Sequence, residues 1–529
     1  MIRSLSTSAV ALIMGAAPVL ADLTPAQVWD SLENYYATMG YTVETGQRDE
    51  SGDTLTVTDI TMTPKTEDST STMTITVPKM VFQQTGDANV RTIIEGDTLI
   101  RSTTTPPGPD AQPVEFQATV SLPDNEMTTS GTPEDMVHQF VYPQAKVEAT
   151  FDNGDASPMP VTLTLEDVKG KQSNTGGATG EMSFESTAAG VDMTFSAEEP
   201  KADDGTGGGT VKGTVRLEDL SVNGTMKMAG EGMNDPQALH LALASGMVLN
   251  GSMSMAKSEG SMDFTGTDDD GQPQSGKATY ATGETDLTFN MSKDGLGYEG
   301  TSKDNAAEMT LASLPFPITY GVAEASGKLM LPIMASDQPQ PFTLAYALKD
   351  LTLGDAIWGL FDPQAKLPRD PASLEIDLSG NAMVNKDLLD PALAEDMQAD
   401  AEQPTSGEAG DENTAEEPAM ADMPFQPQDL TITRVALDAV GAMADLTGKL
   451  TFGDNPSQPV GKIEGSFTGI NALLDTLTSM GLMPQEQLMG TRMMLAMFAR
   501  PSPEDPNVMT TELEFREGGS IFANGQQVK

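Results

Sequence analysis

The side chains best suited to catalysis are too few in this chain to form a recognisable active site. His138 and His240 are the only histidines among 529 residues, and there is no cysteine. Thiolate nucleophiles and thiolate metal sites are therefore excluded, and a Ser-His-Asp triad would depend on one of two imidazoles. Both histidines fall in segments that we predict to be helices, 132–140 and 234–246, so we interpret them as ordinary helix residues.

Two short motifs approach known signatures but lack what the chemistry requires. The run from Gly271 to Ala278 is close to a phosphate-binding loop, but Ala278 stands where a Ser or Thr must reach magnesium, and the segment alternates like a strand. Ser254 and Lys257 have the spacing found in penicillin-binding enzymes. On a predicted strand, however, this spacing directs the two side chains to opposite faces. Neither motif predicts an activity.

The 34 methionines are the remaining candidates for site chemistry. Thioethers select cuprous copper, but no His or Cys reinforces the set, and Met is also a flexible filler of apolar cores. The aspartates at 268–270 lack the alternating spacing and closing Glu of a calcium loop. We therefore expect no cofactor, no metal and no enzyme activity. A hydrolase that uses carboxylates is the enzymatic alternative, because an acidic chain offers many carboxylate pairs.

A repeated segment indicates which elements position the methionines. Residues 223–229, Asn-Gly-Thr-Met-Lys-Met-Ala, recur as residues 250–256, Asn-Gly-Ser-Met-Ser-Met-Ala. In both copies every second residue is apolar or Gly, which is the period of a strand with one buried face. A looser echo links residues 180–184 with 260–264. The pattern predicts a long antiparallel meander that is partly built by duplication.

The apolar face of this predicted meander is the candidate binding site. Its members are spaced two apart along each strand, and flexible Met side chains suit a surface that adapts to its ligand. We expect this face to hold a lipid-like ligand or a protein of the cell envelope. The residues assigned to it are Met226, Met228, Met253, Met255, Met262, Phe264, Leu287 and Phe289.

Alternation sustained over most of the chain predicts a mainly β fold with a few short helices (α+β). We expect a long antiparallel sheet or groove, curved and punctuated by glycine, with a helix pair and a β-hairpin at the C-terminus. The predicted segments are a signal peptide (1–21), a helix with a β-sheet unit (22–170), a meander with internal repeats (171–394), a disordered acidic insertion (395–428) and a β-αα-β unit (429–529).

The N-terminus and the charge predict where the protein works. Arg3, the apolar run 9–17 and the small residue Ala21 follow one another as in an export signal, and the run is too short to span a bilayer. The formal net charge of −49 disfavours nucleic acid and anionic headgroups as partners. We expect an exported, periplasmic protein of a Gram-negative envelope, without a transmembrane anchor.

Two runs carry a resemblance to a known family. Residues 358–363, Trp-Gly-Leu-Phe-Asp-Pro, and 367–371, Leu-Pro-Arg-Asp-Pro, resemble exported alphaproteobacterial proteins grouped as domain of unknown function 2125. The N-terminal helix and the closing hairpin are similar as well, whereas the acidic insertion departs from the family. Because that family has no assigned activity, the resemblance implies no catalytic residue.

In organisation the chain also resembles the AsmA-type envelope proteins, whose long sheets curl into apolar grooves that hold lipid. It departs from them in lacking a transmembrane anchor. The resemblance implies a non-enzymatic envelope protein with a lipid-like ligand. A structural or assembly factor, in which the apolar face is a closed core, is the alternative.

Overall fold

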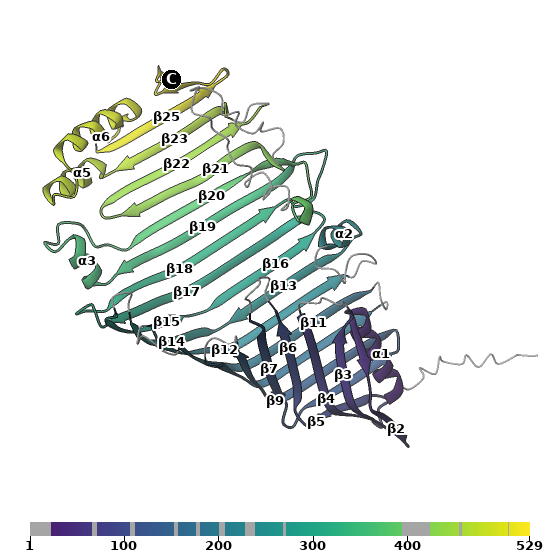
Figure 1. Ribbon diagram of the computed structural model, residues 1–529. Coiled ribbons are helices and arrows are strands. Elements are labelled where there is room, and N and C mark those ends of the chain that lie inside the picture. Colours follow the sequence, from purple (N-terminus) through teal and green to yellow (C-terminus); the bar gives the residue numbers. More distant parts are fainter. Residues whose placement is uncertain are drawn as a thin grey trace, which may run out of the picture.

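The structure is a computed structural model. A sheet dominates the molecule: in the described residues, 27 strands form a single antiparallel sheet with short helices at its edges (Figure 1). This confirms the predicted fold class, including the helix pair and the hairpin at the C-terminus. The predicted signal peptide, Met228 and most of the predicted acidic insertion lie outside the described residues. The structure describes residues 23–65, 71–105, 112–152, 157–175, 180–199, 207–227, 238–267, 271–393, 424–453, 457–505 and 507–529.

The elements have the following bounds. The first strands are β1 (Tyr41–Glu44), β2 (Gln47–Ser51), β3 (Thr54–Pro64), β4 (Ser71–Gln84), β5 (Val90–Glu95), β6 (Thr98–Thr104), β7 (Val114–Ser121), β8 (Glu126–Thr132), β9 (Asp135–Asp152) and β10 (Met159–Thr175). The middle strands are β11 (Glu181–Glu199), β12 (Gly209–Lys227), β13 (Val248–Met255), β14 (Lys257–Thr267), β15 (Pro273–Thr282), β16 (Thr285–Ser292), β17 (Gly295–Leu311), β18 (Ile318–Leu331), β19 (Gln340–Leu353) and β20 (Ala372–Val384). The last strands are β21 (Phe425–Ala439), β22 (Ala442–Thr451), β23 (Val460–Thr468), β24 (Arg500–Pro501), β25 (Val508–Arg516), β26 (Ser520–Ala523) and β27 (Gln526–Gln527). The helices are α1 (Pro25–Thr38), α2 (Leu239–Ala244), α3 (Asp355–Phe361), α5 (Ile470–Ser479) and α6 (Gln485–Phe498).

The strands follow one another across the sheet in nearly the order of the sequence. Each long strand from β9 to β12 and from β17 to β22 pairs with the strands before and after it. Several of the others are collinear halves of one long strand: β13 and β14 both pair with β12, and β15 and β16 both pair with β17. The meander is continuous through residue 170, which lies inside β10.

A line of bulges crosses this meander from β3 to β19 and divides each strand into two halves. We call it the bulge line. On five strands it contains an exposed aspartate in the left-handed region, with φ between 50° and 55°, which an L-residue adopts at a cost that is smaller for Asp and Asn. The register places these positions level across the sheet. They are Asp59, Asp167, Asp219, Asp304 and Asp350.

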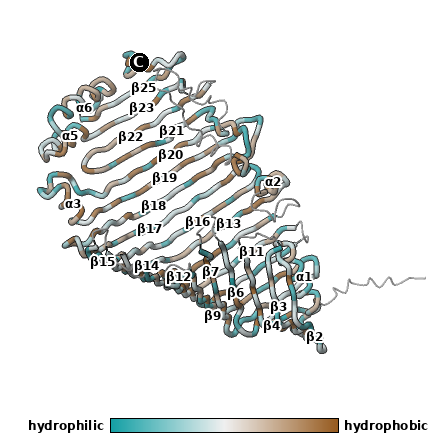
Figure 2. The backbone as a smooth tube through the Cα atoms, viewed as in Figure 1, coloured by the Kyte–Doolittle hydropathy of each residue, from teal (hydrophilic) through white to brown (hydrophobic). Residues whose placement is uncertain are grey.

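The extra residue at each bulge changes the alternation, so both halves of a strand bury their apolar residues on the same side. On β12, Leu217 lies two residues before Asp219 and Leu220 lies one residue after it, so a regular alternation would place the two leucines on opposite faces. Both nevertheless pack against the buried cluster that contains Val168 and Val191. We call this side the apolar face and the other the charged face. Figure 2 shows the resulting alternation of apolar and polar residues along the strands.

The bulge line also corrects the prediction for Ser254 and Lys257. Ala256 separates β13 from β14 on this line, and its amide donates to the carbonyl of Glu218 at 3.0 Å. Ser254 lies opposite Ser221, and Lys257 lies opposite Glu218, so both side chains belong to the charged face. The two residues still lie on strands, not on the successive helical turns that the catalytic motif requires.

Three other predictions are wrong or only partly right. The segment 132–140 is not a helix but the turn between β8 and β9 and the start of β9, and the amide of Asp135 donates to the Thr132 hydroxyl at 3.3 Å. Thr-Pro opens helices and tight turns alike, and here a partner strand is available. The acidic insertion was extended too far, because β21 begins at Phe425. The helix at 234–246 is shorter in the described residues, Leu239–Ala244, and contains His240 as predicted.

The first strands curl in front of the middle of the sheet, with α1 against their apolar face (Figure 1). A capping box begins α1, since Thr24 accepts from the amide of Gln27 at 3.3 Å and its own amide donates to the Gln27 side chain at 2.9 Å. Trp29 packs edge-on against Phe82, with ring centroids 5.9 Å apart. Trp29 and Tyr36 of α1 therefore belong to the core of the first part of the sheet.

Glycines let the sheet curve, and at several of them an aromatic ring from the neighbouring strand lies over the glycine. A Cβ at Gly224 would be 2.7 Å from a ring carbon of Phe184, the residue directly opposite it. Such a ring compensates for the missing side chain of the glycine. The same direct pairing recurs between Phe140 and Gly170, Phe195 and Gly213, Tyr280 and Gly260, Phe264 and Gly276, and Phe342 and Gly380.

Candidate functional site

The strongest candidate site is the part of the apolar face that runs across β16 to β21. Directly opposite residues on six successive strands are all apolar there, so their side chains form one row perpendicular to the strands. With neighbouring strands about 4.8 Å apart, the row extends for about 24 Å. Its members are Phe289, Tyr298, Leu329, Leu344, Leu378 and Ile432.

This row is open to solvent in its middle. Tyr298 is 44% exposed and Leu344 is 45% exposed, and Tyr346, two residues along β19, is 42% exposed. Tyr298 on β17 and Leu344 on β19 lie on either side of the half-buried Leu329 of β18, so the three side chains form one apolar patch. Such patches mark sites that bind apolar ligands or partners.

Glycines form a floor beside the row. Gly300 and Gly327 are directly opposite each other on β17 and β18, between Leu287 and Tyr346. Nothing lies within 4 Å of the position that a Cβ at Gly327 would occupy, whereas one at Gly300 would be 2.6 Å from a methyl carbon of Leu287 and 3.1 Å from the hydroxyl of Tyr298. The apolar face is therefore uncovered over Gly327, and we call this strip between Tyr298, Leu344 and Tyr346 the open groove.

The structure brings most of the predicted site residues onto one face but not into one cluster. Met253 is directly opposite Leu287, and Phe289 begins the open row. Met255 is the last residue of β13, the strand of Met253, and lies beside the bulge line. Met226 is opposite Leu249, farther from the open groove.

Met262 and Phe264 lie on the far side of the bulge line, on β14. The ring of Phe264 covers Gly276 on β15 and so serves the sheet more than an open groove. The prediction missed Tyr298, Leu344 and Tyr346, which lie at the centre of the open row. Their alternation is visible in residues 296–302 and 342–348, but nothing in it distinguishes exposed from covered apolar residues.

One end of the apolar face is covered by α2. Leu243 and Met247 are buried together with Ile333, and Met291 and Leu296 pack against them. Met291 and Leu296 are opposite each other and continue the row that contains Met226 and Leu249. The exposed part of the apolar face therefore begins on the side of this row that lies away from α2.

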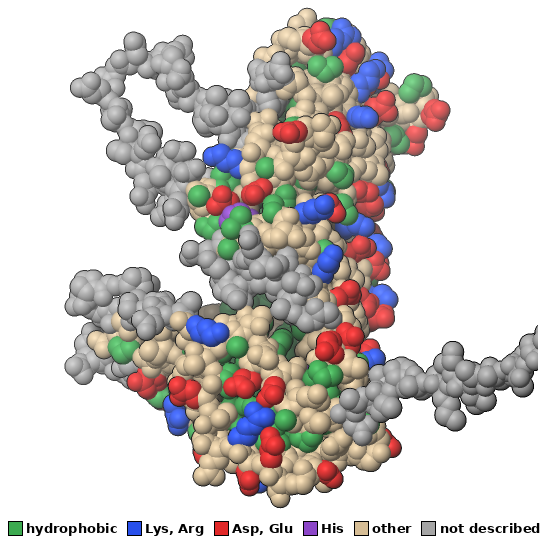
Figure 3. Space-filling view, turned by 90° about the vertical axis from the view of Figure 1, so that its right-hand side faces the viewer, with side chains coloured by type: hydrophobic (Ala, Val, Ile, Leu, Met, Phe, Trp, Pro, Cys, Tyr) green, Lys and Arg blue, Asp and Glu red, His purple; other side chains and the backbone are tan. Residues whose placement is uncertain are grey.

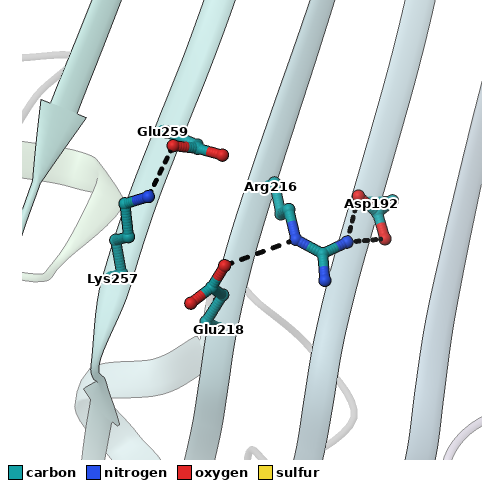
Figure 4. A network of polar contacts seen from close by, with 5 residues as sticks. All are labelled: Asp192, Arg216, Glu218, Lys257 and Glu259. Carbon is teal, nitrogen blue, oxygen red and sulfur yellow. Dashed lines mark hydrogen bonds and ion pairs between the residues drawn. The ribbon is translucent and has the colours of Figure 1, made fainter.

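The opposite, charged face is a lattice of ion pairs between neighbouring strands (Figure 4). Arg216 on β12 donates to Asp192 on β11 at 2.6 Å and lies 3.5 Å from Glu218. The hydrogen bond that Arg216 donates to Asp192 and the charge of that carboxylate raise the pKa of Arg216. Lys257 pairs with Glu259 at 2.7 Å, and that contact raises the pKa of Lys257.

The lattice continues along the sheet. Arg434 on β21 bridges Glu375 on β20 and Asp445 on β22 at 2.7 and 3.0 Å. Figure 3 shows acidic and basic side chains mixed along one margin of the molecule. Further pairs are Glu284 with Lys303, Glu324 with Lys349, Glu299 with Lys328, and Lys462 with Glu512. Because most of these ion pairs join neighbouring strands, the charges serve the pairing of strands, and each exposed pair contributes little stability.

The described residues contain no group of three or more His, Cys, Asp and Glu side chains that could hold a metal ion. His138 lies on β9 and not on a helix, and its Nδ1 is 2.8 Å from the hydroxyl of Thr129 on β8. Burial lowers the pKa of His138. With Thr129 and His138 both buried, this pair belongs to the core of the first part of the sheet.

The run from Trp358 to Pro363 is held together by Asp362, which is fully shielded from solvent. Its two carboxylate oxygens each accept a backbone amide at 2.9 Å, from Lys366 and from Leu367. Burial by itself raises the pKa of Asp362, but these amides and the charges of Arg369 and Lys366 outweigh it and keep the pKa low. Asp362 therefore fixes the turn after α3.

Arg369 links the two runs on which the family resemblance depends. Its guanidinium carbon lies 5.4 Å from the ring centroid of Trp358, and it pairs with Asp355 at 3.0 Å. It also donates to the carbonyl of Asp362 at 3.3 Å. The residues of this signature bind one another and form a structural unit at the end of the sheet.

Comparison with known protein families gives a match that includes this structural unit. Residues 336–522 match the family described as uncharacterized protein conserved in bacteria (DUF2125), and the match includes both runs. No curated protein matches the chain. This part of the chain is therefore similar to a domain of unknown function conserved in bacteria. Among the described residues, no helix combines the length and the apolar composition needed to cross a membrane.

Proposed function

We propose that the protein binds a lipid-like ligand, without catalysis, along the open groove between Tyr298, Leu344 and Tyr346. The observation that supports the proposal is the apolar row across six strands, whose central side chains remain exposed. The described strands form one sheet and not two facing sheets, which favours an open face over a closed core. The protein works in the cell envelope after export, where acyl chains are abundant.

The dimensions suggest a ligand with one extended acyl chain. A chain of about sixteen carbons would lie along the row, whose length is about 24 Å. If about half of its methylenes were buried, the gain would be at most about 6 kcal/mol, from about 0.8 kcal/mol per buried CH₂. This corresponds to a Kd on the order of tens of micromolar, so binding should be reversible.

The charge of the protein selects among lipids. With a formal net charge of −49, the chain repels anionic headgroups and free carboxylates at low ionic strength. A neutral or zwitterionic lipid escapes this repulsion. We expect lysophosphatidylcholine to bind more tightly than palmitate in low salt, and the difference to shrink as salt is added.

The test is ligand uptake by delipidated full-length protein, measured by fluorescence titration and by native mass spectrometry. Leu344→Glu places a carboxylate in the groove, and we expect it to weaken lysophosphatidylcholine binding at least tenfold, because an acyl chain cannot solvate the charge. Met330→Glu is the matched control. Met330 is 41% exposed on the neighbouring strand, but it lies opposite Thr343 on the charged face.

The proposal predicts uptake by the wild type and by Met330→Glu and loss in Leu344→Glu. No uptake by the wild type would refute it. Equal uptake by both variants would place the ligand elsewhere and would refute the assigned groove. Circular dichroism of both variants establishes that the sheet has formed.

A further inference from the structure

The helix α6 has apolar residues on two opposite sides. Leu488 and Leu495 are half-buried and belong to the side that faces the molecule. Met489, Met493 and Met497 are spaced four apart, so they form one stripe on the other side. Met489 is 71% exposed and Met493 is 72% exposed. A soluble helix normally places polar residues on such a side, so this stripe lacks a partner within the described residues.

Neighbouring elements extend this exposed surface. Leu482 precedes α6 and is 54% exposed, and Leu360 on α3 is 65% exposed. The loop after α3 is joined to α5, because the ammonium of Lys366 donates to the carbonyl of Ser479 at 3.0 Å. Figure 1 shows α3, α5 and α6 at the same end of the strands, with α2 at the opposite end. We call these exposed side chains on α3 and α6, with Leu482, the helical-end patch.

The charge of this end differs from that of the rest of the chain. Residues 469–500 contain two acidic residues, Asp475 and Glu486, and two basic residues, Arg492 and Arg500, so their formal charges cancel. Asp475 and Arg492 also pair with each other at 2.7 Å. The chain as a whole has a formal charge of −49. Around α3, residues 355–370 add Asp355, Asp362 and Asp370 against Lys366 and Arg369, a formal charge of −1. An apolar end with so little net charge, on so acidic a protein, suits a partner that is itself apolar and uncharged overall.

We propose that the helical-end patch docks on the surface of a zwitterionic lipid bilayer. Methionine side chains are unbranched and flexible, which suits the irregular interfacial region, and a helix lying in that region buries one apolar side. A second copy of the chain is a poorer occupant, because two molecules of this charge repel each other. The docking needs no anionic lipid and no membrane-spanning segment.

This docking complements the proposed ligand binding but uses different residues. It would hold the ends of the strands at the bilayer, and the open groove crosses those strands. On β19, Leu344 lies nine residues before Leu353, so the groove is about 30 Å from the docked end, and an acyl chain would have to move along the apolar face between them. The inference rests on the proposed function only for this transfer, and the docking itself can be tested without any ligand.

The experiment is flotation of full-length protein with phosphatidylcholine vesicles. The variant Met489→Gln, Met493→Gln, Met497→Gln keeps side-chain length and nearly keeps helix propensity, so α6 should form. The fraction of protein bound at a fixed lipid concentration gives the partition coefficient. We expect that of the triple variant to be at least tenfold below that of the wild type. The matched control is Met330→Gln with Leu241→Gln, which changes exposed apolar residues away from this end of the sheet.

Binding by the wild type and by the control, with loss in the triple variant, supports the proposal. No flotation of the wild type, or equal flotation of all three proteins, overturns it. A wild type that is dimeric by light scattering and a triple variant that is monomeric would assign the patch to a second copy and also overturn it. The triple variant should still take up lysophosphatidylcholine in the absence of vesicles, and Leu344→Glu should still float, so the two proposals can fail separately.

Discussion

Replacing Asp219 by valine should destabilise the sheet although the side chain is exposed. Asp219 lies on the bulge line with φ 53°, where Cβ crowds the backbone of any L-residue. No hydrogen bond of its side chain is among those of the described residues, so the backbone conformation is the main factor. Glycine has no Cβ, and asparagine tolerates this region as aspartate does.

The expected magnitudes follow from the conformation. A β-branched residue forced into the left-handed region costs about 1–2 kcal/mol relative to Gly. We therefore expect Asp219→Gly and Asp219→Asn to stay within about 0.5 kcal/mol of the wild type. Asp219→Val should lose about 1–2 kcal/mol. Substituting Val at Asp167, Asp219, Asp304 and Asp350 together should cost about 4–8 kcal/mol, a large part of the stability of an ordinary domain.

The measurement is guanidinium unfolding followed by circular dichroism in the β region. Asp263→Val is the matched control, because Asp263 is an exposed aspartate of β14 outside the left-handed region. There, Val should be tolerated or slightly stabilising, since β-branched residues suit strands. Comparing the two sites separates the backbone conformation from the loss of a carboxylate. If Asp219→Val unfolds at the same denaturant concentration as Asp219→Gly, the bulge line is not held by left-handed residues and the explanation of the shared apolar face fails.

Two further predictions concern the glycines of the apolar face and the buried histidine. Gly380→Ala should lose about 1–3 kcal/mol in the same unfolding experiment, because its Cβ would collide with the Asp429 carbonyl, while Gly327→Ala, with nothing within 4 Å, should be neutral or stabilising. Equal effects would show that the sheet adjusts freely. Burial lowers the pKa of His138 from 6.5, so below that pH the unfolded chain binds a proton that the folded chain does not, and stability falls as the pH decreases. The decrease in stability between about pH 7.5 and about pH 5.5 should be smaller in His138→Gln, and identical slopes would contradict the assignment.

The sequence specified the elements that depend on neighbouring residues. The capping box of Thr24 and Gln27 begins α1, and Gly481 directly follows the C-cap of α5, so near neighbours set both ends. The apolar alternation of β12 and β13 is likewise a local property, and the two repeat copies became neighbours with Gly224 opposite Gly251. Local signals failed at Thr132, where Thr-Pro begins a hairpin turn, because the choice between helix and turn depends on whether a partner strand is present.

The bulge line had a signal in the sequence that the alternation rule missed. In Leu217-Glu218-Asp219-Leu220 the apolar spacing changes from two to three at an aspartate, and the same change occurs around Asp167. Strict alternation with a period of two contains no such shift, and it therefore predicts opposite faces for Ser254 and Lys257. A search for aspartates at which the apolar spacing changes would have found it.

The sequence by itself determined that every long strand has one apolar and one polar side, because side chains alternate along an extended backbone whatever lies around it. Only the tertiary structure decided which apolar residues stay open. Leu243 of α2 and Met247, which follows this helix, cover Met291 and Leu296, while Leu344 remains exposed, although the local patterns of these strands are alike. Burial depends on which distant segment packs onto a face, and no periodicity along one strand contains that information.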